Sequence, residues 1–478
     1  ITEANQRVFI NVSVLLQKVD TKNIFRSILC IQRIYYYLCR RDFNNVCFVY
    51  MNKIMNAFFV IPVLHEEDNL STLLTDFQVQ KYKNCVCVIC VNNPQEWHSD
   101  EEHIDDIVDN ANSINYLKSI GAKSVKVSYN QGDIEISHDG SEPTFADKEI
   151  ILIDKSTSGN AFPMKKSGVG WARKVMMDYV AHVASDDDII ISMDADTRFP
   201  DTYAMSVCSR FGKYSKATAM SVPYYHTLGE NPIHNECVLR FESYMRHYMA
   251  NMLRIKNMYA FTALGSALAF PVKSYKKVGG ITPYRSGEDF YLLQNLRKVG
   301  NILLWNDDMV FPSGRLSNRV DFGTGPALRK GLNGDWESYP FYEENYFNDV
   351  KTTFDMFPQL YDGDVDTPMT PFLKEILSTD DLWSPLRKNY TTREQFVRAC
   401  MNRVDALRIL QYVKNKHRLN FKSLPLDSRT HYDDDNLSAL YLNYCFNNDG
   451  LEELKAVRDF QYAMEEKCRY EHDEEVFS

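Results

Sequence analysis

The chain has 478 residues, of which 44% are hydrophobic, 25% charged and 13% aromatic, with 20 Gly and 17 Pro. These values are typical of a globular protein and exclude a collagen-like, low-complexity or disordered chain, and the length predicts two or three domains. With 54 Lys and Arg against 64 Asp and Glu, the formal net charge is −10. That balance argues against a nucleic-acid binder, because such proteins neutralise phosphates with basic residues.

The first fifty residues differ in composition from the rest of the chain. They contain no Gly, Pro or Met, and they carry seven basic against three acidic residues. The first methionines of the sequence are Met51 and Met55. Since Gly and Pro are common in average proteins, their absence here is unusual. We therefore expect residues 1–54 to be a non-native or disordered extension that precedes the folded protein.

A strand, a helix and a second strand follow this segment. The continuous apolar run 57–64 ends at polar residues, a pattern typical of a parallel strand buried on both faces. Helical spacing of leucines predicts a helix over 69–80, and the apolar run 85–91 predicts the next strand. This order is a βαβ unit, so a right-handed parallel sheet is expected.

The cysteines and the hydropathy pattern indicate in which cellular compartment the protein is expected. The eleven cysteines show no disulfide or metal framework, and Cys85, Cys87 and Cys90 are expected to be buried thiols in the second strand. An odd number of scattered cysteines suits a reducing compartment, so we predict a cytoplasmic protein. No charge-free apolar stretch reaches about 18 residues, so no membrane-spanning helix is expected, while peripheral membrane contact stays open.

Further elements continue the alternation of strands and helices. The polar stretch 96–148 is predicted to be an insertion, or a helix with loops, over the sheet. Two more strands and an intervening helix are predicted at 148–154, 188–194 and 168–184. Strand patterns end near residue 334, and residues 393–417 form one long amphipathic pattern. We therefore predict a mainly helical C-terminal domain over 336–478.

Two aspartates follow the strand predicted at 188–194. Ligands of open α/β sheets bind at the carboxyl ends of the strands, where Asp194 and Asp196 lie. In an extended chain, residues i and i+2 point to the same side, so both carboxylates would be presented together. Such oxygen ligands suit Mg²⁺ or Mn²⁺, which could neutralise a diphosphate. Taken alone, the pair could equally be two solvated loop residues.

A second acidic pair opens the next helical pattern. Ser286 is predicted to be its N-cap, which places Glu288 and Asp289 in the first turn, where the helix dipole favours ionised carboxylates. A carboxylate near a cleft could take a proton from an incoming hydroxyl group. The alternative is that both residues only complement the helix dipole.

A glycine-rich segment follows at 311–325. It contains Arg315 and Arg319, four residues apart. Arginines and backbone N–H groups suit a diphosphate or an anionic acceptor. Surface salt bridges beside a turn are the alternative, and the segment alone is a weak signal.

Taken together and in order, seven segments resemble a bacterial family 2 glycosyltransferase with the GT-A fold. They are VIPVLHEEDNLSTLL, VNN, GVGWARKVMMD, ISMDADT, ALGSALAFPVKSYKKVGGI, SGEDFYLLQNLRKVG and RLSNRVDFGTG. The resemblance covers residues 57–330 and implies a Rossmann-like α/β domain over 55–335, with a mostly parallel sheet flanked by helices.

The resemblance implies roles for the matching residues. A UDP- or GDP-sugar donor would contact Pro62, Leu64, Glu66, Asn92, Asn93, Arg173, Asp194, Arg315 and Arg319. Asp194 and Asp196 match the metal-binding DxD motif for Mn²⁺ or Mg²⁺, and Gly265 and Ser266 resemble the turn that lines the acceptor cleft. Asp289 matches the catalytic base, with Glu288 as its helper.

The implied reaction is an inverting, metal-dependent transfer of a sugar, which makes the enzyme a hexosyltransferase. The acceptor would be a hydroxyl group of a glycan, a lipid-linked sugar or a small molecule. The Gln-x-x-Arg-Trp motif of processive members is absent, so a non-processive enzyme is expected. A retaining transferase and a catalytically dead sugar- or nucleotide-binding protein remain alternatives. A haloacid dehalogenase-type phosphatase fits poorly, because Arg198 stands where that family has Thr or Val.

Overall fold

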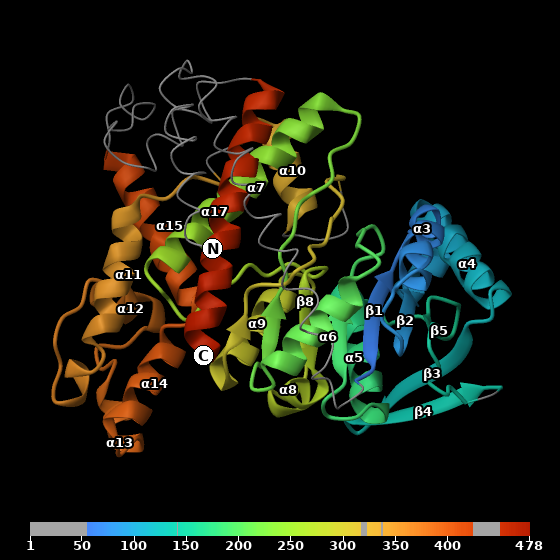
Figure 1. Cartoon of the computed structure of the whole chain (residues 1–478), viewed down its shortest axis with the longest axis horizontal. Helices are drawn as coiled ribbons and strands as arrows, with labels where there is room; N and C mark the ends of the chain where they lie inside the picture. The colour runs from blue at the N-terminus through green and yellow to red at the C-terminus, as the bar shows by residue number, and fades with distance from the viewer. Residues whose placement is uncertain (1–54, 141, 317–322, 336–337, 424–449) are drawn as a thin grey trace, which may run out of the picture. The chain divides into compact units, whose positions relative to one another are not determined.

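The computed structural model describes residues 55–140, 142–316, 323–335, 338–423 and 450–478 (Figure 1). The expected N-terminal extension, residues 1–54, lies outside this range. Met55–Ser478 groups as one unit, which contains a nine-stranded sheet of order β4-β3-β5-β2-β1-β6-β8-β7-β9.

The strands are short and the central ones are parallel. They are β1 (Ala57–Val63), β2 (Cys85–Asn92), β3 (Lys123–Asn130), β4 (Asp133–Asp139), β5 (Glu149–Lys155), β6 (Ile189–Ser192), β7 (Ala219–Ser221), β8 (Leu268–Pro271) and β9 (Ile302–Leu303). Strand β1 pairs in parallel with β2 and β6, while β8 is antiparallel to β6 and β7. The α/β class with a mostly parallel sheet is therefore confirmed.

Helices cover the sheet and then form the C-terminal part of the chain (Figure 1). Those from the first half are α3 (Glu67–Gln78), α4 (Ile104–Ser119), α5 (Val169–Val183), α6 (Tyr203–Lys213), α7 (Pro232–Arg254), α8 (Val272–Lys277), α9 (Glu288–Val299) and α10 (Thr324–Leu332). The later ones are α11 (Glu344–Met356), α12 (Thr370–Leu377), α13 (Ser384–Asn389), α14 (Arg393–Arg403), α15 (Ala406–Ser423) and α17 (Leu451–Phe477). The prediction of a helical C-terminal region is confirmed.

The continuous apolar pattern of β1 reflects burial on both faces of the sheet. Phe58 and Val60 enter one hydrophobic core, whereas Phe59 and Ile61 enter the other. Because successive side chains of a strand point to opposite faces, a strand between two cores must be apolar at every position. The same holds for β2, where Cys85, Cys87 and Cys90 are free and buried as expected.

Residues 96–148, predicted to be an insertion or a helix with loops over the sheet, contain two strands in addition to a helix. After α4, this stretch forms β3 and β4, which pair as an antiparallel hairpin and extend the sheet at one edge. In β4, the half-buried Ile134 and Ile136 alternate with exposed polar residues and pack against the core, so a short strand signal is present that the interpretation of this stretch as an insertion did not use.

The single amphipathic pattern predicted over 393–417 is interrupted. Helix α14 ends at Arg403 and α15 begins at Ala406. Between them, the Asp405 carboxylate accepts the backbone N–H of Arg408 (3.3 Å) and pairs with Lys298 (2.7 Å). An aspartate that satisfies a backbone N–H group in this way starts a new helix, and the apolar periodicity does not reveal it.

The last helix returns to the sheet-bearing part of the chain. In Figure 1, α17 runs alongside α7, and the Asp473 carboxylate accepts the backbone N–H groups of Leu304 (2.8 Å) and Trp305 (3.0 Å), just after β9. The division of the chain at residue 335 stays a prediction. Among the described helices, none combines the length and hydropathy needed to cross a membrane.

Candidate functional site

Arg173, on α5, joins the two acidic motifs at the carboxyl edge of the central strands. This side chain is buried, and its guanidinium donates to Asp194 Oδ1 (2.5 Å), to Glu288 Oε1 and to Ser192 Oγ (3.3 Å). Asp194 follows β6, and Glu288 begins α9. Three motifs that are far apart in the sequence therefore meet at one buried cation.

Gly265 leaves the space that the Arg173 guanidinium occupies. A Cβ atom at this position would lie 2.1 Å from Nη2 of Arg173, well inside van der Waals contact. The carbonyl oxygen of Gly265 accepts a hydrogen bond from Ser192 Oγ (2.7 Å), while the neighbouring Ser266 is buried. The turn predicted to line an acceptor cleft thus packs directly against the central arginine.

Arg315 forms a second bridge, between the end of β1 and the DxD motif. Its Nε donates to Asp196 Oδ2 (2.6 Å), and its Nη2 donates to Glu66. Glu66 is buried, and its other oxygen accepts from Asn69 Nδ2 (2.6 Å). Each aspartate of the DxD motif is therefore held by a different arginine.

The backbone at the DxD motif is a turn and not an extended strand. Strand β6 ends at Ser192, and the N–H of Thr197 donates to the carbonyl of Asp194 (3.1 Å), which closes the turn. The extended geometry assumed from the sequence was wrong, because the strand ends before the motif. The two carboxylates leave this turn toward different partners, Asp194 toward Arg173 and Asp196 toward Arg315.

The charge of the site favours a cation. Besides the acidic pair on α9, the three carboxylates of Glu66, Asp194 and Asp196 pair with the two guanidinium groups of Arg173 and Arg315. Within the described ranges, no group of three or more His, Cys, Asp or Glu side chains has the arrangement of a metal site. Mg²⁺ commonly takes only one or two carboxylates, together with substrate phosphates. The donor set of Asp194 and Asp196 fits that mode, and the Asp194 side chain is 39% exposed.

Burial changes the protonation of the acidic pair on α9. It raises the pKa of Glu288 to about 7, against the opposing attraction of Arg173, and the neighbouring Asp289 carboxylate adds to the rise. Burial also raises the pKa of Asp289, whose Oδ1 accepts the N–H of Phe290 (2.7 Å). These carboxylates therefore hold protons at a higher pH than exposed ones do.

The start of α9 differs by one residue from the prediction. Gly287 is the N-cap, with a left-handed φ of 77°, and no side chain caps the helix. Ser286 was predicted as the N-cap, which is wrong: the helix begins one residue later, and the left-handed φ of the observed cap residue suits glycine. Glu288 and Asp289 do lie in the first turn, as predicted.

The remaining predicted donor contacts lie at the ends of β1 and β2. Pro62 and Leu64 are half-buried. The buried Asn92 donates through Nδ2 to the carbonyl of Val63 (2.9 Å), and Asn93 Oδ1 accepts from Asn110 Nδ2 (2.9 Å). These amides join the ends of the two strands to each other and to α4. Arg319 lies outside the described residues.

Two contacts at this site were not expected from the sequence. Ser192 bonds to both Arg173 and Gly265, and it is a small polar residue at the end of an otherwise apolar strand, a signal that could have revealed it. Arg198 donates to both oxygens of Asp76 on α3 (2.5 and 2.8 Å) and so ties the DxD turn to that helix. No sequence pattern joins residues so far apart.

No model of a known protein family matches this chain, and no curated protein matches it. Solved structures that are similar include residues 1–349 of S. aureus TarS in complex with UDP, with a TM-score of 0.33, 10% identity, and coverage of 77% of this chain and 92% of that one. Another is the mannosyltransferase PcManGT from Pyrobaculum calidifontis in complex with GDP-Man and Mn²⁺, with a TM-score of 0.33, 9% identity, and coverage of 80% and 99%. At these scores the similarity assigns neither a family nor a ligand to this chain.

Proposed function

We propose that this chain is a glycosyltransferase that uses a nucleotide-sugar donor and a divalent metal ion. The observation that carries the proposal is the buried Arg173, which bonds to the DxD motif through Asp194 and to the Glu-Asp motif through Glu288. A transferase needs a site for the leaving diphosphate beside a base for the acceptor. The guanidinium of Arg173 contacts both candidate motifs, the DxD motif on the donor side and the Glu-Asp motif on the acceptor side.

On the donor side, Asp194 and Asp196 would hold Mn²⁺ or Mg²⁺. The bound ion would neutralise negative charge that develops on the leaving nucleoside diphosphate. Arg315 is 35% exposed, against 5% for Arg173, so we propose that Arg315 contacts the phosphates directly. Its planar guanidinium suits bidentate recognition of phosphate.

On the acceptor side, we propose that Asp289 takes the proton of the acceptor hydroxyl group. The acceptor oxygen then forms a bond to the anomeric carbon, and the bond from that carbon to the phosphate oxygen breaks. A base works best when its pKa is near the working pH, and burial raises the pKa values of this pair in that direction. A single displacement of this kind inverts the anomeric configuration.

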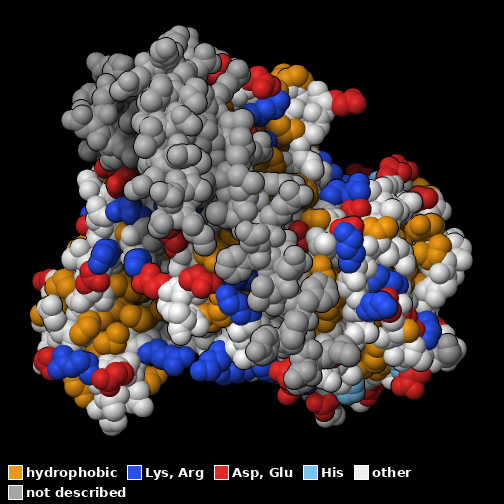
Figure 2. Space-filling model, in the orientation of Figure 1, with side chains coloured by type: hydrophobic (Ala, Val, Ile, Leu, Met, Phe, Trp, Pro, Cys, Tyr) orange, Lys and Arg blue, Asp and Glu red, His pale blue; other side chains and the backbone are white. Residues whose placement is uncertain are grey.

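The surface charge supports a small donor bound in a local site. In Figure 2, Lys and Arg side chains are interspersed with Asp and Glu over the described residues of the face in view. A long polyanion such as nucleic acid is recognised by a continuous basic surface. We assign the transferase activity to residues 55–335 and propose a non-processive, cytoplasmic enzyme.

The proposal is tested with Asp289→Asn, which keeps the size of the side chain and removes the base. UDP-GlcNAc and GDP-mannose, each with Mn²⁺, serve as donors, and released nucleoside diphosphate and glycosylated acceptor are measured. We expect transfer to fall by about two to four orders of magnitude, while nucleotide binding stays within about twofold. Asp405→Asn, at the start of α15, is the matched control.

Near-normal transfer by Asp289→Asn would contradict the assignment of the base. If a product forms, NMR of its anomeric centre separates inversion from retention. If the wild-type protein binds a donor but neither hydrolyses nor transfers it under any of these conditions, the chain is a binding protein and not an enzyme.

A further inference from the structure

A ladder of buried charged side chains joins the C-terminal helix α17 to α7. Arg246 donates to Glu242 Oε1 (3.0 and 2.6 Å) and to Glu465 Oε2 (2.8 Å), and Arg469 donates to Glu465 Oε1 (2.7 Å). All four side chains are at most 3% exposed. Charges buried this deeply are stable only when they are paired, so the ladder fixes how the two helices lie against each other.

A polar face of α17 points inward from Arg458 to Asp473. Its buried polar residues, spaced three or four apart, are Arg458, Gln461, Glu465, Arg469 and Asp473. This spacing places them on one face of a helix. At the C-terminal end of that face, Arg469 donates to the carbonyls of Ser221 and Leu304 (both 2.9 Å), which lie at the ends of β7 and β9.

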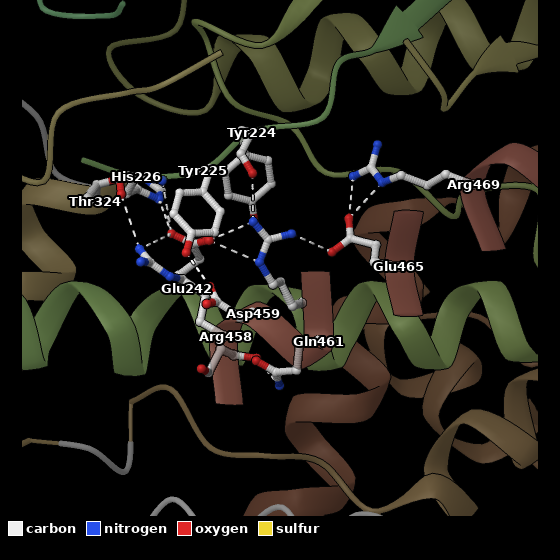
Figure 3. Close-up of polar contacts among 12 residues, drawn as sticks. Tyr224, Tyr225, His226, Glu242, Thr324, Arg458, Asp459, Gln461, Glu465 and Arg469 are labelled. Atoms are coloured by element: carbon white, nitrogen blue, oxygen red, sulfur yellow. Dashed lines mark hydrogen bonds and ion pairs between the residues drawn. The ribbon is translucent and has the colours of Figure 1, made fainter. Parts of the chain in front are cut away.

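Arg246 on α7 and Arg458 on α17 also hold the backbone that follows β7 (Figure 3). Arg246 donates to the carbonyl of Tyr224 (2.6 Å), and Arg458 donates to the carbonyl of His226 (3.1 Å). The hydroxyl of Tyr225 donates to Asp459. Each residue from 224 to 226 is thus bonded to a side chain of α7 or α17.

His226 adds a contact to a third helix (Figure 3). Its Nδ1 lies 2.9 Å from Glu242 Oε2, and its Nε2 lies 3.3 Å from the hydroxyl of Thr324, the first residue of α10. The imidazole is 1% exposed, so it bridges α7 and α10 inside the protein.

The same backbone pairs with the segment that carries Arg315. The N–H of Tyr225 donates to the carbonyl of Val310 (3.0 Å), and the N–H of Thr227 donates to the carbonyl of Pro312 (2.9 Å). A Cβ atom on Gly314 would lie 2.6 Å from Val238 and 2.9 Å from the carbonyl of Thr227, so this residue also packs closely. Arg315 follows directly.

We propose that α17 is a positioning element of the donor site. Its Asp459 and Arg458 hold residues 225 and 226, the backbone of Tyr225 and Thr227 holds residues 310–312, and the guanidinium of Arg315 is thereby placed against Asp196 and Glu66. Tyr225 and Asp459 are positioning residues, since they act through Arg315 and do not contact the substrate. The inference rests on the proposed function for one point, that Arg315 binds the diphosphate of the donor.

The first test is Tyr225→Phe, which removes only the hydroxyl bonded to Asp459. The dissociation constants of UDP and of GDP are measured with Mn²⁺ present. We expect the constant of whichever nucleotide binds to rise about three- to tenfold. The matched control is Tyr412→Phe, which also removes a hydroxyl bonded to an aspartate (Asp349, 2.6 Å) but lies on α15. We expect the control to leave nucleotide binding unchanged.

A double-mutant cycle separates positioning from general destabilisation. Arg315→Ala alone should weaken nucleotide binding by tenfold or more. In the Arg315→Ala background, Tyr225→Phe should have no further effect, because the group that it positions is gone. Thr324→Val removes the hydroxyl that contacts His226 and can replace Tyr225→Phe in a second double-mutant cycle. It should weaken nucleotide binding in the wild-type background and have no further effect in the Arg315→Ala background.

The outcomes distinguish this inference from the proposed function. If the wild-type protein binds neither UDP nor GDP with Mn²⁺, the proposed function is wrong and the inference with it. If the wild-type protein binds one of them and Arg315→Ala weakens binding, the function stands. In that case, a Tyr225→Phe effect that is absent, or that persists equally without Arg315, overturns the inference alone.

Discussion

At the residue scale, the candidate site depends on a glycine as much as on its charged groups. Arg173 can bond to Asp194 and Glu288 only because residue 265 has no side chain in the space beside it. The family resemblance implies that Gly265 lines an acceptor cleft. The structure adds that it packs against the arginine, which no local pattern could reveal, because the contact joins residues 92 positions apart.

Gly265→Ala should therefore damage the site by displacing the guanidinium of Arg173. We expect kcat/KM to fall at least tenfold and the free energy of unfolding to fall by about 1–3 kcal/mol, because a buried ion pair is disturbed. Donor turnover and urea unfolding measure the two effects. Gly363→Ala is the control, since a Cβ atom there meets nothing within 4 Å. Equal behaviour of the two variants would contradict the steric role of Gly265.

The raised pKa of Glu288 predicts a pH dependence of stability. Between its ordinary value of 4.5 and its folded value of about 7, the folded protein keeps a proton that the unfolded chain has released. The stability from this group is therefore fully present below pH 4.5 and is lost as the pH rises through 7. Relative to Glu288→Gln, the wild-type protein should lose up to about 3 kcal/mol across this range.

Urea unfolding of both proteins from pH 4.5 to 8 measures this difference. Asp289, whose pKa is raised as well, contributes in the same direction in both proteins. A difference in stability that stays constant with pH, or that grows in favour of the wild type as the pH rises, would show that Glu288 is not protonated in the folded state at neutral pH.

At the element scale, α17 shows why a charged stripe is hard to interpret from sequence. Charged residues spaced three or four apart on a helix usually face solvent, and nothing local distinguishes Glu465 from the exposed Glu471. The difference arises from Arg246 on α7, more than 200 positions earlier. By contrast, β1, β2, α3 and α5 were predictable, because their apolar periodicity matches their burial.

Removal of one partner from the ladder should be costly. Glu465→Ala leaves Arg246 and Arg469 buried without their shared carboxylate, so we expect a loss of about 3–5 kcal/mol in the free energy of unfolding. Glu471→Ala, on the exposed face of the same helix, should cost less than about 0.5 kcal/mol. Thermal and urea unfolding compare the two variants, and similar losses would show that the ladder does not stabilise the fold.

At the scale of the whole molecule, the sequence pattern predicted the four adjacent parallel strands β5, β2, β1 and β6 and the order of the motifs, but not their connections. The parallel strands and the helical C-terminal region could be predicted from apolar periodicity. The return of α17 to α7 depends on partners that are distant in sequence, whereas the hairpin of β3 and β4 and the turn at Asp194 are local features that were not predicted. The candidate site is thus supported by elements from both ends of the described chain.

The central claim is that this site binds a nucleotide sugar through a metal ion held by Asp194 and Asp196. Isothermal titration of UDP-GlcNAc and GDP-mannose, with and without Mn²⁺, tests it most directly, using the wild-type protein and an Asp194→Asn, Asp196→Asn double variant. We predict that one donor binds the wild-type protein only with Mn²⁺, and that the double variant loses at least about tenfold in affinity. Binding that is independent of the metal, equal in both proteins or absent for both donors would contradict the claim.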